Sequence, residues 1–348
     1  MAGGDPIARR TALRAGAALA LSAVLPRPGR AQSATRAVVD AAGRHVTIPS
    51  PPRRVFPAGP GAAVLVAVLA PDRLAGWTGT LPAVARAVLP GSLVDKPVLG
   101  RLTATPPTAD AARVRDSGAD LVLDMGTVND AYAAIAESIQ GGSGVPAILL
   151  DGALARTPAL LRQAGTLLGT AARGEALAVQ AEGLLADTRS RIAGWQPPRL
   201  WYGRGERALQ AASPASIGTE VPVLLGCTLP TPAAGDPAGT SVTLVEAFAP
   251  EVVLVERASL AEALRTDPLW AATPAGRAGR ILVAPSGPFG WVDGPPSIQR
   301  LLGLRWLLSA VRPDLLPPAA MRAEAAGLLG SFFGIAADDG LLDRMLGA

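Results

Sequence analysis

The amino-acid sequence predicts an α/β fold in which two Rossmann-like α/β lobes are joined by a single long helix. Short apolar strands alternate with helical patterns along most of the chain, which favours parallel sheets. Two similar segments, Arg54 to Gly61 and Leu200 to Gly205, each run from a strand into a glycine-containing turn. Between them, Ala172 to Trp195 carries apolar residues at helical spacing. We therefore expect one lobe before this helix and one lobe after it.

The expected boundaries are 36–171 for the N-terminal lobe, 172–195 for the connecting helix and 197–348 for the C-terminal lobe. The helix would be roughly 36 Å long, at about 1.5 Å per residue. Gly174 and Gly183 weaken it, each by about 1 kcal/mol relative to Ala. A chain of 348 residues can form two such lobes, and its 49% hydrophobic content is typical of a globular protein.

The first 31 residues differ from the rest of the chain. They contain five arginines and one aspartate, which account for the whole net charge of +4, so the remainder is balanced and we expect no nucleic-acid binding. Arg9 to Leu13 resembles a twin-arginine export motif, Ala15 to Leu25 is an apolar segment too short to span a membrane, and Ala31 ends a small-residue cleavage site. We therefore expect residues 1–31 to be a twin-arginine-type signal peptide and the protein to be exported, soluble and periplasmic.

The N-terminal half is expected to begin with a β-hairpin over Val38 to Ile48, because turn residues at Asp40 to Gly43 separate two alternating segments. Pro49 to Pro52 ends the hairpin. Short apolar runs then predict strands, and helical periodicity predicts helices. The expected elements, in order, are a strand at Arg54 to Pro57, a helix at Ala62 to Leu69, a strand at Ala75 to Trp77, a helix at Val84 to Leu89, a strand at Leu121 to Leu123, a helix at Ala131 to Ile139, a strand at Ala147 to Leu150 and a helix at Thr157 to Leu168.

The C-terminal half is expected to begin with a strand at Leu200 to Tyr202. Ala211 to Thr240 is rich in Gly, Pro, Ser and Thr, which predicts long loops. The later elements are expected to be strands at Val252 to Val255 and Ile281 to Ala284 with a helix at Leu260 to Leu264 between them, a loop at Pro285 to Pro296, a helix at Ile298 to Leu308 and two shorter helices. In sheets of this kind a ligand usually binds at the carboxyl ends of the strands.

Several segments match those of one protein family in order and spacing. They are the opening hairpin Val39 to Pro49, the strand–helix–strand unit Arg54 to Trp77, the strands Gly118 to Leu123 and Ala249 to Val255, and the Pro288 to Leu307 run. The chain thereby resembles the class III periplasmic substrate-binding proteins of ABC importers, and its Pro-Phe-Gly-Trp-Val-Asp-Gly-Pro-Pro-Ser sequence looks like a signature of one iron-complex branch. The resemblance implies a monomer that captures an iron-siderophore or related metal chelate between two lobes and delivers it to an ABC permease.

Other functions stay open at this point. The same fold suits an oxyanion such as molybdate or tungstate, haem or cobalamin, and a periplasmic α/β enzyme or a sensor is a further alternative. In the family each lobe usually presents a glutamate to the permease, but the matching positions here are Ala112 and Thr243, with Asp110 and Glu246 nearby. The segment Ser216 to Thr231 also departs from the family pattern.

The scarcity of histidine and cysteine limits which metal sites and catalytic groups the sequence can form. The sequence has one histidine, His45, and one cysteine, Cys227. Direct capture of Zn²⁺ or Mn²⁺ needs several histidines with a carboxylate, and a Ser-His-Asp hydrolase would need a Gly-x-Ser-x-Gly elbow that the sequence lacks. We therefore expect no catalytic residue, no protein-bound metal ion and no cofactor.

The first expected ligand contacts are in the N-terminal lobe. Gly59, Pro60 and Gly61 form a turn whose backbone N–H groups at a helix N-terminus suit an anionic ligand, although an ordinary strand–helix turn has the same pattern. Trp77 supplies an aromatic wall or packs in the core. The sequence therefore allows either a ligand contact or an ordinary structural role for the turn and for Trp77.

The remaining expected contacts follow strands or lie in a stiff loop. Thr127 and Asn129 come just after the strand at Leu121, and Tyr202 and Arg204 lie at the carboxyl end of the first strand of the second lobe. A tyrosine there can stack on a chelate or ligate it, and an arginine can pair with carboxylates or an oxyanion. Trp291, in a Pro/Gly-rich loop, either lines the pocket or packs its own lobe.

Overall fold

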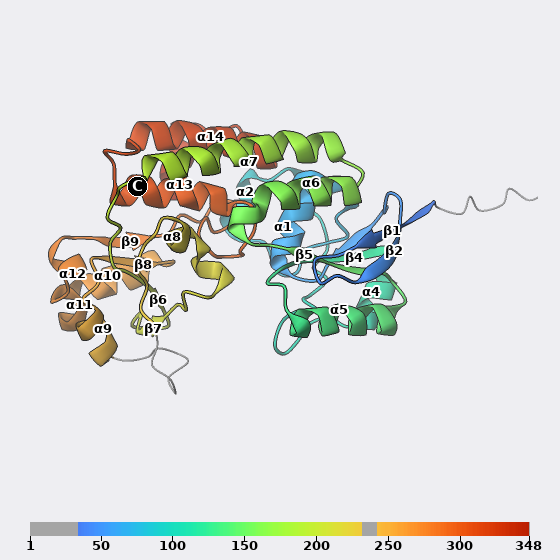
Figure 1. Ribbon diagram of the computed structural model, residues 1–348, viewed down its shortest axis with the longest axis horizontal. Helices are drawn as coiled ribbons and strands as arrows, with labels where there is room; N and C mark the ends of the chain where they lie inside the picture. The colour runs from blue at the N-terminus through green and yellow to red at the C-terminus, as the bar shows by residue number, and fades with distance from the viewer. Residues whose placement is uncertain (1–33, 232–241, 348) are drawn as a thin grey trace, which may run out of the picture. The chain divides into compact units, whose positions relative to one another are not determined.

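The computed structural model describes residues 34–231 and 242–347 of the chain (Figure 1). The expected signal peptide at residues 1–31 lies outside the described residues, as does the end of the expected loop region at Ala211 to Thr240. In the described part, no helix combines the length and the apolar character needed to cross a membrane.

The predicted hairpin is confirmed. Strands β1 (Thr35–Val39) and β2 (His45–Pro49) pair antiparallel. Asp40, which is buried, holds the turn because its carboxylate accepts the backbone N–H groups of Ala42 and Arg44, both at 3.0 Å. The Arg44 guanidinium also donates to the carbonyl oxygen of Ala147, at 2.9 Å, which anchors the hairpin to the first lobe.

The first lobe contains a parallel three-stranded sheet of β3 (Val55–Pro57), β4 (Leu121–Gly126) and β5 (Ala147–Asp151). Alternate residues of these strands enter separate apolar clusters, one containing Val55 and the other Phe56. The helices of this lobe are α1 (Pro60–Leu69), α2 (Ala83–Val88), α3 (Gly91–Val94), α4 (Ala111–Asp116), α5 (Asp130–Ser143) and α6 (Thr157–Leu167). Figure 1 shows α1 and α6 on one side of this sheet and α4 and α5 on the other.

One expected strand of this lobe is wrong. Ala75 to Trp77 forms no strand, because only isolated bridges hold this part of the chain, Val55 to Leu74 and Trp77 to Val98. The pairing changes partner within three residues: the Ala75 N–H donates to Val55 at 2.9 Å, and the Trp77 N–H donates to Pro97 at 2.8 Å. A segment that changes partner so soon cannot extend a ladder.

Helix α7 (Ala171–Arg191) leads from the first lobe to the second. It ends at Arg191, earlier than the expected Trp195, and Gly194 beyond it has a positive φ of 75°. Gly174, expected only to weaken the helix, has a packing role. A Cβ at Gly165 of α6 would lie 2.9 Å from the Gly174 Cα, so these two glycines let α6 and α7 approach closely.

The second lobe contains a four-stranded sheet in the order β7-β6-β8-β9. Its strands are β6 (Leu200–Arg204), β7 (Gln210–Ala211), β8 (Val252–Val255) and β9 (Ile281–Val283), and only β7 is antiparallel. Its shorter helices are α8 (Glu220–Leu224), α9 (Val242–Phe248), α10 (Ala258–Thr266), α11 (Pro268–Ala271) and α12 (Pro274–Arg277).

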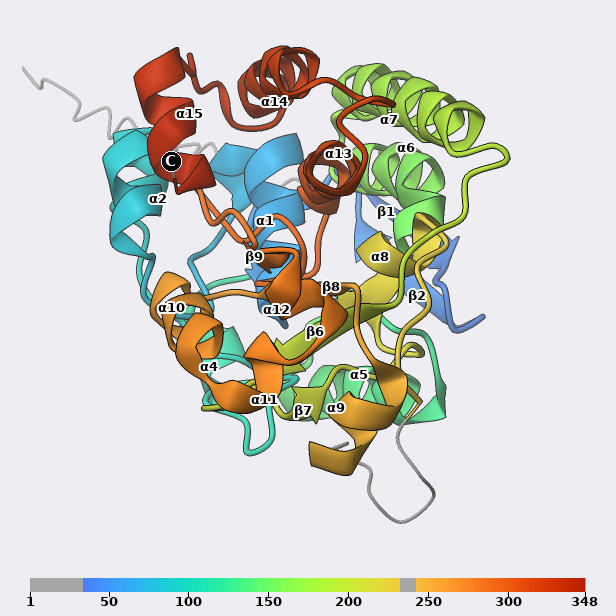
Figure 2. The ribbon, with the colours of Figure 1, turned by 90° about the vertical axis from the view of Figure 1, so that its left-hand side faces the viewer.

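Three helices close the chain: α13 (Arg300–Val311), α14 (Pro318–Phe333) and α15 (Asp339–Leu346). Two shorter final helices were expected, but α14 is 16 residues long and α13 only 12. Figures 1 and 2 both show α6, α7, α13 and α14 gathered in one helical layer over the sheets. The two-lobed α/β fold is thus confirmed.

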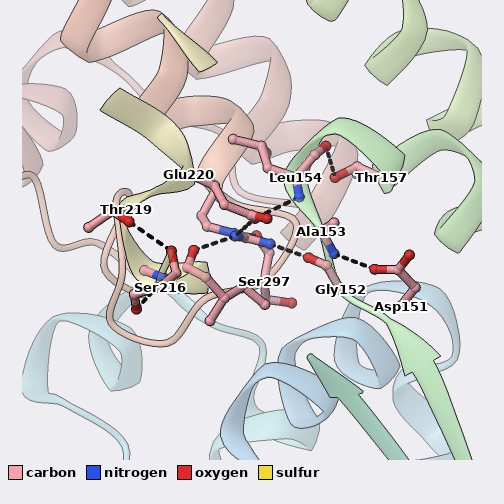
Figure 3. Close-up of polar contacts among 12 residues, drawn as sticks. Asp151, Gly152, Ala153, Leu154, Thr157, Ser216, Thr219, Glu220 and Ser297 are labelled. Atoms are coloured by element: carbon pink, nitrogen blue, oxygen red, sulfur yellow. Dashed lines mark hydrogen bonds and ion pairs between the residues drawn. The ribbon is translucent and has the colours of Figure 1, made fainter. Parts of the chain in front are cut away.

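A buried arginine joins the two lobes. Arg300, 1% exposed at the start of α13, donates to the carbonyl oxygens of Ile217 at 2.9 Å and of Gly152, and it pairs with Glu220. Glu220 in turn accepts the backbone N–H of Leu154 at 2.8 Å. Gly152 and Leu154 follow β5 of the first lobe, whereas Ile217 and Glu220 belong to the second (Figure 3). This inter-lobe network therefore fixes the lobes against each other at their inner faces.

We expect Glu220→Ala to lower the free energy of unfolding by about 3 kcal/mol, because it leaves the Arg300 charge buried without its partner. Urea unfolding of the variant and the parent protein measures the loss. Glu262→Ala, which removes an exposed carboxylate of α10, is the control and should stay within about 0.5 kcal/mol of the parent. An equal effect of both substitutions would contradict the role given to the network.

Candidate ligand-binding site

A cavity of about 390 Å³ lies between the lobes, which is within the usual size range of small-molecule sites. Both lobes contribute to its walls. The N-terminal lobe supplies Pro60, Ala63, Val64, residues 77–82 and Arg101, and the C-terminal lobe supplies Glu256, Phe289 and residues 293–296. A second cavity of about 250 Å³ shares Pro82, Glu256, Phe289, Asp293 and Gly294 with the first. The two cavities therefore adjoin.

Two aromatic rings of the cavity lining contact each other. The rings of Trp77 and Phe289, one from each lobe, lie 5.6 Å apart. Trp77 is only 4% exposed, and its indole N–H donates to the carbonyl oxygen of Leu93 at 2.7 Å. Trp77 therefore both packs in the core and lines the cavity, which combines the two roles that its sequence position allowed.

The N-terminus of α1 is largely covered. Of the expected turn, only Pro60 lines the cavity, and proline has no backbone N–H to donate. A Cβ at Gly61 would lie 2.6 Å from the carbonyl oxygen of Pro296, and Ser297 donates its hydroxyl to the Gly61 carbonyl at 2.9 Å. Gly59 packs against Asp124, whose carboxylate would lie 3.5 Å from a Cβ there. Gly59 and Gly61 are therefore packed against the protein's own groups, and neither lines the cavity.

Four polar side chains meet at the wall that the C-terminal lobe contributes. The hydroxyl of Tyr202, at the end of β6, donates to Glu256 Oε1 at 2.6 Å. Arg204 pairs with Asp293 and lies 5.2 Å from the centre of the Tyr202 ring. Glu256 and Asp293 line the cavity, whereas Tyr202 is fully buried behind them. Tyr202 and Arg204 thus act on the cavity through the two carboxylates.

The ionisation of this group follows from burial and neighbouring charge. Burial raises the pKa of Tyr202, and the nearby Glu256 and Asp293 carboxylates raise it further, so the hydroxyl stays a neutral donor. Burial also raises the pKa of Asp293 above its ordinary value, although the Arg204 guanidinium opposes this effect. Glu256 and Asp293 are the members of this group that line the cavity, and two arginines line it and the adjoining cavity with them, Arg101 in the first and Arg257 in the second.

Three of the expected site residues lie elsewhere. Asn129 caps α5, accepting the backbone N–H of Tyr132 at 3.0 Å, and Thr127 is exposed; neither is among the residues lining the cavities. Trp291 is fully buried, and its indole N–H donates to the Gly287 carbonyl at 2.7 Å. Of the two roles open to Trp291, the structure gives it packing within its lobe.

The sequence interpretation also missed residues of the site. Glu256 follows β8 directly, so the rule that ligands bind at the carboxyl ends of strands would have indicated it. Three further residues of the site lie in loops, namely Asp293, Phe289 and Arg101. No sequence signal indicates that these residues come together. Within residues 34–231 and 242–347, no group of three or more His, Cys, Asp or Glu side chains could hold a metal ion.

Solved structures of solute-binding proteins share this fold. An ABC transporter solute-binding protein from Sulfurospirillum deleyianum has a TM-score of 0.80 at 20% identity, over 90% of this chain and 99% of its own. A periplasmic solute-binding protein from Veillonella parvula has a TM-score of 0.72 at 17% identity, over 90% and 97%. The periplasmic molybdate-binding protein MolA of a Haemophilus influenzae ABC transporter, bound to molybdate, has a TM-score of 0.67 at 16% identity, over 87% and 99%.

No protein-family model matches the chain, and no curated protein does. At such low identities the structural likeness establishes the fold: a two-lobed α/β architecture found in periplasmic binding proteins of ABC transporters. It agrees with the family that the sequence resembles. The ligand of this chain does not follow from it.

We expect Gly61→Ala to destabilise the protein by about 1–2 kcal/mol, because its Cβ would press on the Pro296 carbonyl oxygen. The clash should outweigh the helical preference of Ala over Gly, about 1 kcal/mol. Gly79→Ala is the matched control: Gly79 lines the same cavity, and a Cβ there meets nothing within 4 Å. Thermal unfolding should show a lower Tm for the first variant only, and two unchanged Tm values would refute the proposed contact.

We expect Asp124→Asn to change how stability depends on pH. Burial raises the pKa of Asp124 above its ordinary value of 3.8, so the folded protein holds this proton more tightly than the unfolded chain. The cost of ionising Asp124 is absent below about pH 4 and grows as the pH rises towards the raised pKa. The Asn variant should therefore gain stability relative to the parent as the pH rises from about 4 to 7.

Chemical denaturation at several pH values tests this dependence. The Asn side chain can still accept the Met125 backbone N–H, which Asp124 accepts at 2.9 Å, so the local geometry is kept. Asp116→Asn, at an exposed position of α4, is the control. A stability difference that does not change with pH would show that Asp124 is not perturbed by burial.

Proposed function

We propose that this protein is the periplasmic solute-binding protein of an ABC importer, which captures an iron-siderophore or related metal chelate between its two lobes. The observation that carries the proposal is the cavity between the lobes, which is lined by the aromatic pair Trp77 and Phe289 and by the acidic residues Glu256 and Asp293. An apolar cavity with a few converging polar groups is typical of a small-molecule site. The fold shared with ABC transporter binding proteins supports the same function.

The mechanism is binding with limited movement of the lobes. The inter-lobe network of Arg300 and Glu220 restrains the lobes near the cavity, and helix α7 connects them as one continuous element. A ligand then gains most of its affinity from a preformed site, because little closure has to be driven. No residue of the cavity has to act as a nucleophile or a general acid in this role.

The proposed partner is an ABC permease, and the binding protein acts as a monomer. Ala112 and Thr243, where the family has its docking glutamates, are both exposed. Asp110 uses its carboxylate to cap α4, accepting the Arg113 N–H at 2.9 Å, whereas Glu246 is exposed on α9. Glu246 is thus the better placed of the two acidic residues to contact a permease.

A titration of the full-length protein with metal chelates tests the function. We expect a ferric trihydroxamate, haemin, cobalamin or molybdate to quench the tryptophan fluorescence and raise the Tm, with one chemical class clearly preferred. Gly79→Trp should weaken the binding of the preferred ligand about tenfold or more, because the indole occupies the cavity at a position where a side chain meets nothing within 4 Å.

Gly141→Trp is the control, since Gly141 lies on the exposed face of α5, is not among the residues lining the cavities, and also has open space for a side chain. It should bind like the parent protein. The proposal fails if no chelate binds, if Gly79→Trp binds normally, or if the purified protein converts any of these compounds to a product.

A further inference from the structure

The smaller of the two adjoining cavities is too small to hold a chelate by itself. Its volume is about 250 Å³, below the range of roughly 300–1,000 Å³ that is usual for small-molecule sites. It shares part of its lining with the larger cavity, namely Pro82, Glu256, Phe289, Asp293 and Gly294. A group attached to a ligand in the larger cavity therefore has a short path into the smaller one.

The residues that only the smaller cavity has are mostly apolar. The apolar ones are half-buried or buried, and they are Val84, Ala284, Pro285, Pro288 and Val292. Two polar residues, Ser286 and Arg257, also line this cavity alone, and both are exposed. Buried apolar walls suit an aliphatic group, because its binding removes apolar surface of both partners from water.

Both lobes form the smaller cavity, and their contact there is direct. Val84 comes from α2 of the first lobe, whereas residues 284–294 belong to the loop after β9 of the second. A Cβ at Gly287 would lie 3.2 Å from Cγ2 of Val84. The loop is held by Trp291, whose backbone N–H donates to the Pro285 carbonyl at 2.9 Å and whose indole N–H donates to the Gly287 carbonyl at 2.7 Å. The walls are therefore preformed, which lowers the cost of binding.

Charge does not decide what the smaller cavity binds. The charged residues that line the two cavities comprise two arginines and two carboxylates, namely Arg101, Arg257, Glu256 and Asp293. Because the two signs are equal in number, the apolar walls are the feature that distinguishes the smaller cavity.

We infer that the smaller cavity binds a short aliphatic arm of the metal chelate whose core occupies the larger cavity. The inference rests on the proposed function and specifies one part of its ligand. Each methylene group that is fully buried against Val84, Pro288 and Val292 strengthens binding roughly fourfold. The two cavities together therefore favour an acylated chelate over the same chelate without the aliphatic arm.

The test compares two ferric trihydroxamates that have the same core and charge and differ only in one acyl arm, which is acetyl in the first and hexanoyl in the second. We expect the full-length protein to bind the hexanoyl form about tenfold more tightly than the acetyl form, as measured by quenching of tryptophan fluorescence. Complete burial of the additional methylene groups would give a larger ratio, but the arm stays partly exposed beside Ser286 and Arg257.

Val84→Phe should abolish the preference for the hexanoyl form, because the larger ring fills the smaller cavity, while the acetyl form binds as before. An unchanged Tm verifies that the fold is kept. Ser286→Phe fills the same cavity from the other lobe and should have the same effect, so the test does not depend on one variant. Val179→Phe is the matched control: Val179 is 55% exposed on α7, is not among the residues lining the cavities, and should keep the preference when substituted.

The possible outcomes separate the inference from the function on which it rests. Equal binding of the two forms, a preference that survives in a folded Val84→Phe or Ser286→Phe variant, or an equal loss of both forms in these variants would overturn the inference and leave the chelate-binding function in place. Failure of both forms to bind would overturn the inference, and failure of haemin, cobalamin and molybdate as well would overturn the function. A preference that is present in the parent and in Val179→Phe, and lost in the two cavity variants, supports the inference.

Discussion

The need to satisfy one buried guanidinium constrains how the two lobes meet. Arg300 is almost fully buried, and burial alone lowers its pKa, an effect that the Glu220 carboxylate opposes. An unpaired charge at such a depth would be very costly, so each nitrogen needs an acceptor. Those acceptors come from Gly152 in one lobe and from Ile217 and Glu220 in the other. Only a narrow range of lobe arrangements supplies all of them together.

The same arginine positions the wall of the cavity. Its Nε donates to the Ser297 carbonyl at 3.0 Å, and the Ser297 hydroxyl donates to the Gly61 carbonyl at 2.9 Å. Ser297 is therefore tied at once to the C-terminal lobe's buried arginine and to the first turn of α1. Residues 293–296, which line the cavity, immediately precede it. These two hydrogen bonds therefore fix the chain next to this part of the cavity wall, which favours a preorganised site.

The sequence predicted the elements whose signals are local. The hairpin turn at Asp40, the strand at Leu121 and the long helical pattern before Trp195 each reflect spacing and turn chemistry within a few residues, and all three have counterparts in the structure. The expected strand at Ala75 is wrong because its backbone changes pairing partner within three residues, which no local signal indicates. The inter-lobe network could not be predicted for the same reason: Arg300 and Glu220 are 80 residues apart, and nothing local to either indicates the other.

The candidate site, like the fold, could be predicted only where a local sequence signal indicates it. Tyr202 and Arg204 were expected to contact the ligand because they end a strand, and the structure places them beside Glu256 and Asp293, which line the cavity while Tyr202 and Arg204 do not. The position of Tyr202 and Arg204 at the end of a strand therefore predicted that they lie near the cavity, but not which side chains line it. Tyr202 donates to Glu256 and Arg204 pairs with Asp293, so both residues contact carboxylates of the cavity lining. Which of these four side chains line the cavity is thus decided by tertiary pairs between residues 54 and 89 positions apart, and residue types along the chain do not indicate those pairs.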